Sequence, residues 1–300
     1  MSGSAAVLAE VVRSGFVEGR HRGALVVLGA DGSVVRVVGD PELPVFPRSS
    51  NKPMQAAGVL RAGLPLSGER LALAAASHAG EDFHRELAAR MLAEHGLTEA
   101  ALRCPPEGGS RLAMNCSGKH AAMLAACAVN GWPTESYTDP GHPLQVLIRE
   151  TAEAATGEPV AHTGVDGCGA PLFAFSLTGL ARAFRAFVLA APDTPERRVA
   201  DAMRAHPEYV GGTARADSLL MRAVPGVLSK AGAEGVQAVA LPDGRALAFK
   251  VEDGAARARG PVLASVLRSL DVPVPGPAAG ALVSAVEGGG RVVGEVRAVV

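Results

Sequence analysis

Residues 24–38 read ALVVLGADGSVVRVV, with two β-branched runs on either side of the tetrapeptide GADG. Valine-rich runs separated by a turn rich in Gly and Asp are typical of a β-hairpin. The sequence therefore predicts that an antiparallel sheet begins near the N-terminus, with strands at 24–28 and 33–38.

A second hairpin is predicted towards the other end of the chain. Residues 236–241 and 245–251 are apolar runs on either side of the turn sequence Pro-Asp-Gly at 242–244. Residues 261–270 then indicate a helix, and residues 291–300 indicate a return to strand. Strands are thus expected at both ends of the chain.

The residues between these ends have a mainly helical pattern. Phe83, Leu87 and Met91 recur on one helical face, and Gly96 follows as a stop signal. A later helix is predicted to start at Thr194, whose hydroxyl can cap a first turn that begins with proline. The middle of the chain is therefore expected to form a group of helices.

Together these patterns predict an α/β fold with one antiparallel sheet built from both chain ends and an inserted helical lobe. We expect a single catalytic domain over residues 1–300, with a sheet lobe of about 1–66 and 226–300 and a helical lobe of about 67–225. The crevice between two such lobes is the natural place for a ligand.

The composition excludes several partners. Lys and Arg total 29 against 30 Asp and Glu, a formal charge of -1, so no basic excess is available for nucleic acid. No apolar run is long enough to span a bilayer. Residues 1–12 lack a basic segment and Glu10 interrupts their apolar run, so neither a signal peptide nor an anchor is indicated. We expect a cytoplasmic protein with no membrane partner.

Ser49 and Lys52 lie three residues apart in the string PRSSNKPMQA at 47–56. On a helical turn this spacing puts both side chains on one face. A serine hydroxyl is a poor nucleophile unless a base takes its proton, and a neutral lysine can do so. The spacing agrees with the Ser-x-x-Lys arrangement of serine acyl-transferring enzymes, although a solvated pair of side chains has the same spacing.

Lys230 begins the triad Lys-Ala-Gly directly before the predicted strand at 236–241. In penicillin-recognising enzymes a Lys-x-Gly triad lies on a strand that faces the serine. The middle residue here lacks the usual hydroxyl, and a surface lysine at a turn is the alternative interpretation.

Two cysteines lie in separate strings, Cys116 in NCSGKH and Cys168 in GVDGCGAP. With Asp166 and His120 close in sequence, their thiolates could gather a borderline cation such as zinc. No C-x-x-C motif is present, and on ligand spacing alone two buried structural thiols are favoured.

Two further strings combine hydroxyl, imidazole and charged groups. Ser77, His78 and Glu81 lie in ASHAGE, and Arg215 and Asp217 lie in GGTARADS. One cation and one acid near a helix start suit the two charged ends of an amino acid. Capped helix ends explain both strings equally well.

In this order the strings resemble those of the bacterial asparaginase II family, also called class 3 or Rhizobium-type L-asparaginases, over nearly the whole chain. The matching strings are PRS with Lys52, SHAGE, NCSGKH, VDGCG, residues 212–217 and KAGAEG. The resemblance implies a fold related to serine β-lactamases and glutaminases. It also implies that Ser49 is the nucleophile and Lys52 its base, with Ser77 and Lys230 as a second catalytic pair.

The resemblance implies a zinc site as well. Its ligands would be Cys116, Lys119 and Cys168, with Asp166 nearby. A lysine ligand must lose its proton, so metal binding at such a site depends on pH.

The remaining assignments concern the charged ends of the substrate. Arg215 is the first choice for the α-carboxylate and Arg48 the second. Glu81 or Asp217 is expected to hold the α-ammonium, and two further residues of the matching strings, His78 and Asn115, are assigned to substrate binding.

The expected activity is hydrolysis of L-asparagine to L-aspartate and ammonia through a serine acyl-enzyme, in a homodimer. Because a lysine base must be neutral, activity is expected to rise with pH into the alkaline range. One alternative is a glutaminase or another amidase of the same fold, since a pocket distinguishes these substrates by one methylene. A non-catalytic amino-acid-binding zinc module is the other.

Overall fold

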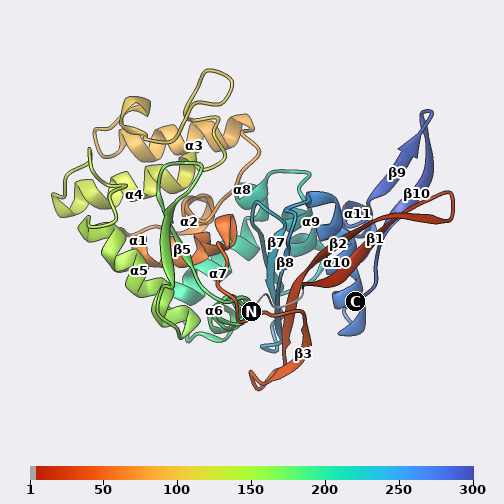
Figure 1. The fold of residues 1–300 in the computed structure, drawn as a ribbon. Helices are drawn as coiled ribbons and strands as arrows, with labels where there is room; N and C mark the ends of the chain where they lie inside the picture. The colour runs from red at the N-terminus through yellow and green to blue at the C-terminus, as the bar shows by residue number, and fades with distance from the viewer. Residues whose placement is uncertain (1–4) are drawn as a thin grey trace.

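The computed structural model describes residues 5–300, in which a large antiparallel sheet lies beside a group of helices (Figure 1). Residues 1–4, part of the stretch in which no signal peptide was predicted, lie outside the described residues. Within 5–300, no helix is both long and apolar enough to cross a membrane.

The main sheet has eight strands in the order β6-β7-β8-β2-β1-β10-β9, with β3 also paired to β2. The strands are β1 (Ala6–Arg13), β2 (Phe16–Leu28), β3 (Val34–Val38), β6 (Leu228–Ala231), β7 (Val236–Ala240), β8 (Ala246–Val251), β9 (Ala285–Gly288) and β10 (Arg291–Ala298). Both predicted hairpins are confirmed as β2–β3 and β7–β8. The pairs β2–β8 and β1–β10 join the two chain ends into one sheet, as predicted.

The helices lie mainly between β3 and β6 in the chain. They are η1 (Arg48–Asn51), α1 (Lys52–Arg61), α2 (Gly68–Ala74), α3 (Asp82–Ala93), η2 (Glu99–Ala101), α4 (Ser117–Asn130), α5 (Pro143–Thr156), α6 (Leu177–Leu189), α7 (Pro195–Ala205), α8 (Pro207–Gly211), α9 (Ala216–Ala223), α10 (Ala256–Ser269) and α11 (Gly276–Ala281). The helix predicted to start at Thr194 is α7, and the Thr194 hydroxyl accepts a hydrogen bond from the backbone N–H of Arg197.

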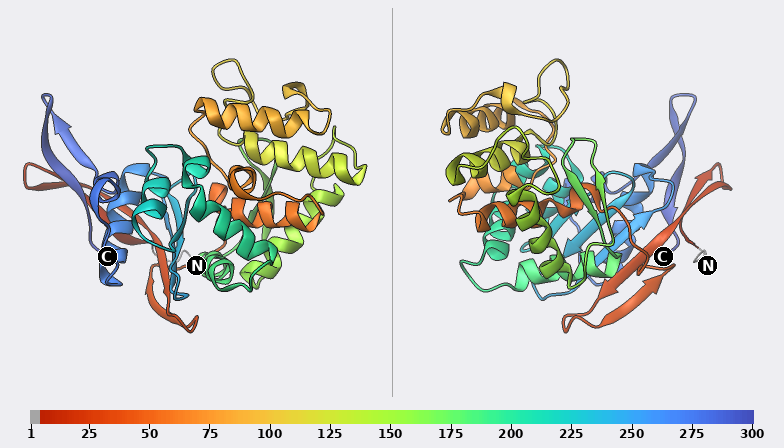
Figure 2. Two further views of the ribbon diagram at one scale, coloured as in Figure 1. Left: turned by 180° about the vertical axis from the view of Figure 1, so that it is seen from behind. Right: turned by 60° about the vertical axis from the view of Figure 1, so that its left-hand side comes forward.

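Helices pack against the sheet from two sides. Helix α6 contacts β2, β7 and β8, and α10 contacts β1, β7 and β10. Figure 2 shows α10 and α11 on the side of the sheet away from the large helical group, and the tips of the β1–β2 and β9–β10 hairpins extend beyond them. Side chains of the sheet, of α6 and of the helical group form one continuous hydrophobic core.

The structure differs from the expected boundaries in two places. Helices begin at Lys52, before the expected start at 67, because α1 packs against α4, α5 and α7. The range expected to be helical also contains a two-stranded hairpin, β4 (His162–Val165) with β5 (Pro171–Ala174). This hairpin carries Asp166 and Cys168 in its connecting turn.

Candidate active site

Ser49 lies where the sheet leads into the first helix. The 3-10 turn η1 runs directly into α1, so Ser49 and Lys52 are one turn apart, as the spacing predicted. Arg48, just before the serine, has a φ of 52°, a left-handed conformation that non-glycine residues rarely adopt. Such strain is often found at functional sites.

The ammonium of Lys52 is fully buried and has three hydrogen-bond partners. Nζ lies 2.5 Å from the carbonyl oxygen of Ala76, 2.9 Å from Oγ of Ser77 and 3.1 Å from Sγ of Cys116. With all three protons donated, the lysine has no free lone pair. To act as a base it must be neutral, with Ser77 or Cys116 donating to it instead.

A cavity of about 370 Å³ opens beside Ser49. It is lined by Ser49, Ser77, Asn115, Gly211, Arg215, Ala216, Asp217, Lys230, Ala231, Gly232, Ala233, Gln237 and Arg259. Three of the four predicted catalytic residues thus line one cavity, and the fourth, Lys52, lies behind Ser77.

Strand β6 brings Lys230 to this cavity, and Gly232 allows the close approach. A Cβ at position 232 would lie 2.3 Å from the carbonyl oxygen of Pro47 and 3.0 Å from Oγ of Ser50. The Ser50 hydroxyl donates to the carbonyl of Lys230 at 3.1 Å, which fastens the strand to the serine turn. Only glycine fits at 232 without moving one of these segments.

Lys230 and Asp217 form a buried pair. Lys230 Nζ lies 4.0 Å from Oδ2 of Asp217 and donates to the carbonyl of Ala231. Burial lowers the pKa of Lys230 to about 7, with the carboxylate of Asp217 opposing the shift and nearby cations adding to it.

The carboxylate of Asp217 is held mainly by the protein itself. It accepts hydrogen bonds from Ser229, from the N–H of Ala231 and from Gln237. Burial alone would raise its pKa, but the charge of Lys230 helps to lower it. The residue expected to bind a substrate ammonium therefore lines the cavity but also anchors β6 and faces Lys230.

Two arginines line the cavity. Arg215, the first choice for the substrate carboxylate, donates to the carbonyl of Ser77 at 2.8 Å. Arg259, in the first turns of α10, donates to the carbonyl of Gly232 at 3.2 Å. Sequence reasoning did not find Arg259, because no motif surrounds it and Arg257 beside it has the same side chain.

His78 and Glu81 do not line the cavity. The His78 ring bonds Oγ of Ser117 at 2.9 Å and accepts from the N–H of Gly80, and burial lowers its pKa to about 2. The carboxylate of Glu81 accepts two hydrogen bonds from Thr213, so it fixes the loop before Arg215. Both residues therefore hold segments next to the cavity in place and do not line the cavity themselves.

The other two predicted binding residues have different surroundings. Arg48, the second choice for the carboxylate, pairs with Asp166 at 2.8 Å, and neither residue lines the cavity. Asn115 does line it, and its Oδ1 lies 3.0 Å from Sγ of Cys116.

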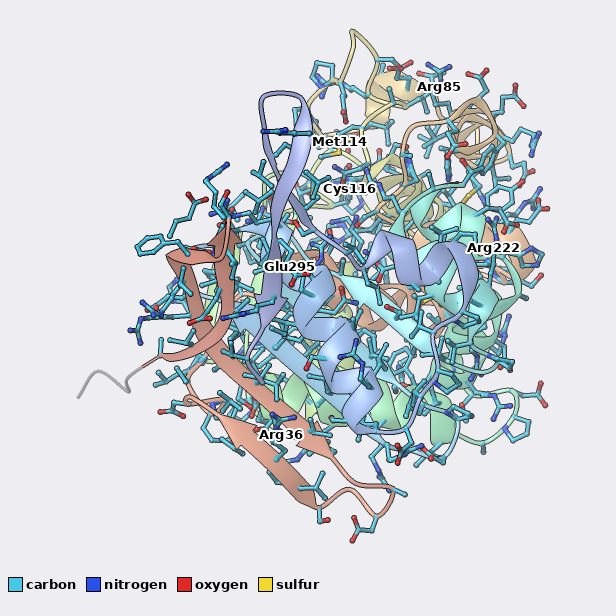
Figure 3. All side chains as sticks on the ribbon, turned by 90° about the vertical axis from the view of Figure 1, so that its right-hand side faces the viewer. Arg36, Arg85, Met114, Cys116, Arg222 and Glu295 are labelled. Atoms are coloured by element: carbon cyan, nitrogen blue, oxygen red, sulfur yellow. The ribbon has the colours of Figure 1, made fainter. Side chains whose placement is uncertain are left out.

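The three predicted metal ligands converge behind the cavity. Lys119 Nζ lies 3.0 Å from Sγ of Cys168, and that sulfur lies 3.7 Å from Oδ2 of Asp166. A hydrogen bond from Cys116, and the charge of Lys119, lower the pKa of the Cys168 thiol to about 5. Figure 3 labels Cys116 with its neighbour Met114, whose sulfur accepts from the N–H of Cys116.

Tetrahedral zinc separates a sulfur and a nitrogen or oxygen ligand by about 3.6 Å. The Cys168–Asp166 distance agrees with this value, whereas Lys119 and Cys168 lie at hydrogen-bond distance and would have to move apart by about 0.6 Å to hold the metal. Within residues 5–300, no three His, Cys, Asp or Glu side chains are close enough together to hold a metal. The set therefore depends on Lys119, which would have to release a proton that the cysteine sulfurs stabilise.

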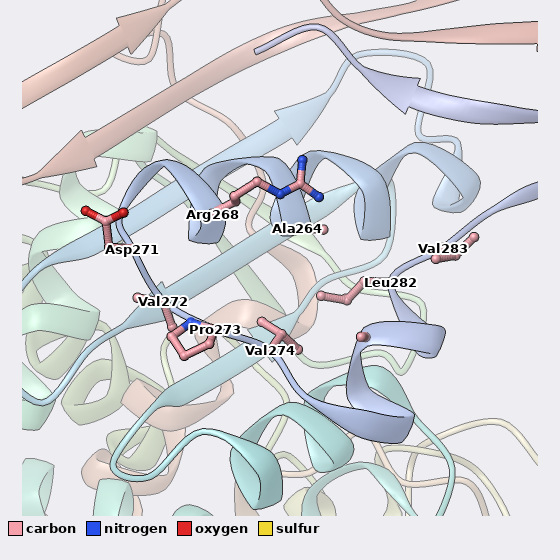
Figure 4. A pocket seen from close by; sticks show the side chains of 9 residues that line it. Ala264, Arg268, Asp271, Val272, Pro273, Val274, Leu282 and Val283 are labelled. Atoms are coloured by element: carbon pink, nitrogen blue, oxygen red, sulfur yellow. The ribbon is translucent and has the colours of Figure 1, made fainter.

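A larger cavity of about 520 Å³ lies between α10 and α11, lined by Arg268 and Asp271 and mostly by apolar side chains (Figure 4). It contains none of the predicted site residues. The chemistry of this chain therefore concentrates at the smaller cavity beside Ser49.

Comparison with solved structures finds the same fold. Mglu in its glutamate form is 12% identical over 90% of this chain and 65% of its own, with a TM-score of 0.51. A Bacillus glutaminase is 11% identical over 83% and 91%, and a β-lactamase from Mycobacterium bovis is 13% identical over 82% and 94%, each with a TM-score of 0.45. The chain spans 64% of the native form of Mglu.

The family comparison covers almost the entire chain. The sequence matches none of the curated proteins with which it was compared. The family model described as L-asparaginase II matches residues 9–298. The predicted family resemblance is thereby confirmed, the fold is shared with Mglu, and the chain belongs to the L-asparaginase II family.

Proposed function

We propose that this chain is an amide hydrolase that converts L-asparagine to L-aspartate and ammonia through a serine acyl-enzyme. The main support is that Ser49, Ser77 and Lys230 line one cavity together with Arg215. The chain is also a member of the L-asparaginase II family. Residues 1–300 then act as a single catalytic domain whose site lies between the sheet and the helices.

In the first step Oγ of Ser49 attacks the side-chain amide carbon of the substrate, forming a C–O bond. Neutral Lys52 takes the hydroxyl proton, since it lies one helical turn away on the same segment. The electron pair of the carbonyl moves to oxygen. Backbone N–H groups at the start of η1 are proposed to stabilise that oxyanion, an effect of about 3 kcal/mol per donor.

Collapse of the intermediate breaks the C–N bond, and the leaving nitrogen needs a proton. The hydroxyl of Ser77 is bonded to Lys52 Nζ and also lines the cavity. Ser77 can therefore pass its own proton to the nitrogen and recover one from the Lys52 ammonium. Ammonia leaves, and an aspartyl ester remains on Ser49.

Water then hydrolyses the ester by the same steps in reverse order. Lys52, neutral again, takes a proton from the attacking water, and Ser49 leaves as the hydroxyl. The products are L-aspartate and free enzyme. Each residue returns to its starting protonation state.

We also propose that Cys116, Lys119 and Cys168, with Asp166 nearby, hold zinc. Two sulfurs with one nitrogen and one oxygen form a donor set that zinc accepts. When bound, the metal would supply positive charge and fixed geometry behind the cavity. The proton transfers above use only Ser49, Lys52 and Ser77.

The test is ammonia release from L-asparagine and, in parallel, from L-glutamine, with wild type, Ser49→Ala and Ser50→Ala. Ser50 is the neighbouring serine, but its hydroxyl is buried and bonds a backbone carbonyl. We expect Ser49→Ala to be inert, whereas Ser50→Ala, which loses only the hydrogen bond to β6, should keep measurable turnover. Equal turnover in wild type and Ser49→Ala would refute the nucleophile, and preference for glutamine would refute the substrate.

A further inference from the structure

The cavity beside Ser49 has more positive than negative charge. Its charged lining residues are Arg215, Asp217, Lys230 and Arg259. Asp217 already accepts three hydrogen bonds from the protein and faces Lys230. Asp217 is the single acid among these four residues and acts on both Lys230 and Arg259, so the lining keeps a net positive charge.

Neither arginine forms an ion pair with any residue in the range 5–300. Each is fixed instead by one hydrogen bond to a backbone carbonyl, Arg215 to Ser77 and Arg259 to Gly232. A guanidinium has five N–H donors in a fork that suits a carboxylate. Both groups are thus oriented and keep donors for a ligand.

The two anchoring carbonyls belong to two different segments that line the cavity together with Ser49. Ser77 bonds Lys52, and Gly232 lies directly against Pro47, two residues before Ser49. The two arginines therefore reach the cavity of Ser49 from separate segments, the loop before α9 and the helix α10. A ligand with one carboxylate can satisfy one of them, whereas a short dicarboxylate can satisfy both.

We propose that Arg215 and Arg259 form a two-arginine site for a four-carbon dicarboxylate, so that the enzyme retains L-aspartate and is competitively inhibited by it. This inference rests on the proposed function for the identity of the product. L-Asparagine has one carboxylate and L-aspartate has two. Hydrolysis thus creates the group that the second arginine binds, and Arg259 discriminates product from substrate.

The rival role of Arg259 is purely structural, as a brace for the carbonyl of Gly232. A brace would affect turnover and stability but not the difference in affinity between aspartate and asparagine. Binding to the Ser49→Ala variant separates the two roles, because asparagine is then not consumed.

The experiment is calorimetric titration of L-aspartate, succinate and L-asparagine into Ser49→Ala, alone and combined with Arg259→Gln, Arg259→Lys or Arg268→Gln. Arg268 is the matched control, since it lies on the same helix and lines the other cavity. We expect Arg259→Gln to weaken aspartate and succinate by about tenfold or more and asparagine much less. Arg259→Lys should recover part of the loss, and Arg268→Gln should behave as its parent.

Equal weakening of aspartate and asparagine in Arg259→Gln would overturn the inference, as would an undiminished affinity for aspartate. If Arg259→Gln does not fold, Arg259→Lys decides, because loss of the fork geometry should still weaken the dicarboxylates more than asparagine. Ammonia release by wild type tests the proposed function separately. Aspartate binding that depends on Arg259 in a protein without asparaginase activity would support this inference and refute that function.

Discussion

The hydroxyl of Ser77 lies 2.9 Å from Nζ of Lys52, although 25 residues separate them. Ser49 itself forms no side-chain hydrogen bond with Lys52 within residues 5–300. In the free enzyme, Lys52 therefore contacts Ser77, the serine that we propose passes a proton to the leaving nitrogen. The two residues should act as one unit, with Ser77 needed in the step that expels ammonia.

Ser77→Ala should lower kcat by about 10²- to 10⁴-fold, the usual contribution of a positioned proton donor, with little change in KM. Because the pair acts as a unit, the double variant with Lys52→Ala should be no slower than Lys52→Ala alone. Steady-state kinetics on the three variants measures both effects. Multiplicative losses in the double variant would show that the residues act independently.

Gly232→Ala should impair both stability and turnover. A Cβ there meets the carbonyl oxygen of Pro47 at 2.3 Å, so β6 must move away from the serine turn. Overpacking of this kind costs about 1–3 kcal/mol. Gly141→Ala is the control, because Gly141 has open space around its Cβ position.

The free energy of unfolding measured with urea and the kcat should both fall in Gly232→Ala. Both should stay near the wild-type values in Gly141→Ala. A stable Gly232→Ala with normal turnover would mean that β6 tolerates a different distance from Ser49. The placement of Lys230 would then not depend on the glycine.

The fold was largely predictable because its two hairpins are local. The valine runs at 24–28 and 33–38 and the turn at 242–244 determine their own pairing, and the sheet follows once both ends are strands. The extent of the helical part was harder to predict. Helix α1 has a weak apolar pattern and is nearly all buried, so its periodicity gives little signal.

The site was predictable only where the residues lie in short strings. Ser49 and Lys52 share a helical turn, so their spacing alone brings them together. The contact between Lys52 and Ser77 depends on tertiary packing of α1 against the loop after α2. Arg259 reaches the cavity only because α10 lies against the sheet beside Gly232.

Charge alone also misled the assignment of acids and cations. Glu81 was expected at a substrate ammonium, but the loop at Thr213 engages both of its oxygens. Arg48 was a candidate for the carboxylate, and Asp166 occupies it. A sequence shows which residues are charged, whereas their partners are determined by loops that meet only in the folded chain.

Removal of the proposed zinc should leave the chain folded and weaken substrate binding. The ligands lie at the start of α4 and in the β4–β5 turn, whereas the two chain ends are joined by the strand pairs β2–β8 and β1–β10, in which no ligand takes part. We expect a chelator to raise KM for asparagine and to leave the circular dichroism spectrum unchanged. Cys168→Ser should reproduce the effect and lower the bound zinc measured by mass spectrometry.

A chain that unfolds on chelation would instead support a structural metal. The Cys127→Ser variant serves as control, since Cys127 is a buried thiol of α4 that bonds none of the proposed ligands. Its zinc content should match that of wild type. Zinc content that is zero in every variant, including wild type, would remove the metal from the proposal.

The affinity for L-aspartate should fall as pH rises through about 7. Burial lowers the pKa of Lys230 to about 7, and Lys52, Arg259 and Arg215 lower it further, whereas Asp217 raises it. Lys230 is therefore a cation below pH 7 and neutral above it. The cavity therefore loses one positive charge as pH rises. The two carboxylates of L-aspartate are then bound less tightly.

Asp217→Asn removes the negative charge that raises the pKa of Lys230, so the inflection should move to lower pH. The inhibition constant of L-aspartate, measured from about pH 5 to 9 in wild type and Asp217→Asn, reports the shift directly. Lys230→Met should abolish the inflection, because no titrating group remains at that position. An inflection that persists unchanged in Lys230→Met would assign the pH dependence to a different group. An inflection at the wild-type pH in Asp217→Asn would mean that the carboxylate does not act on Lys230.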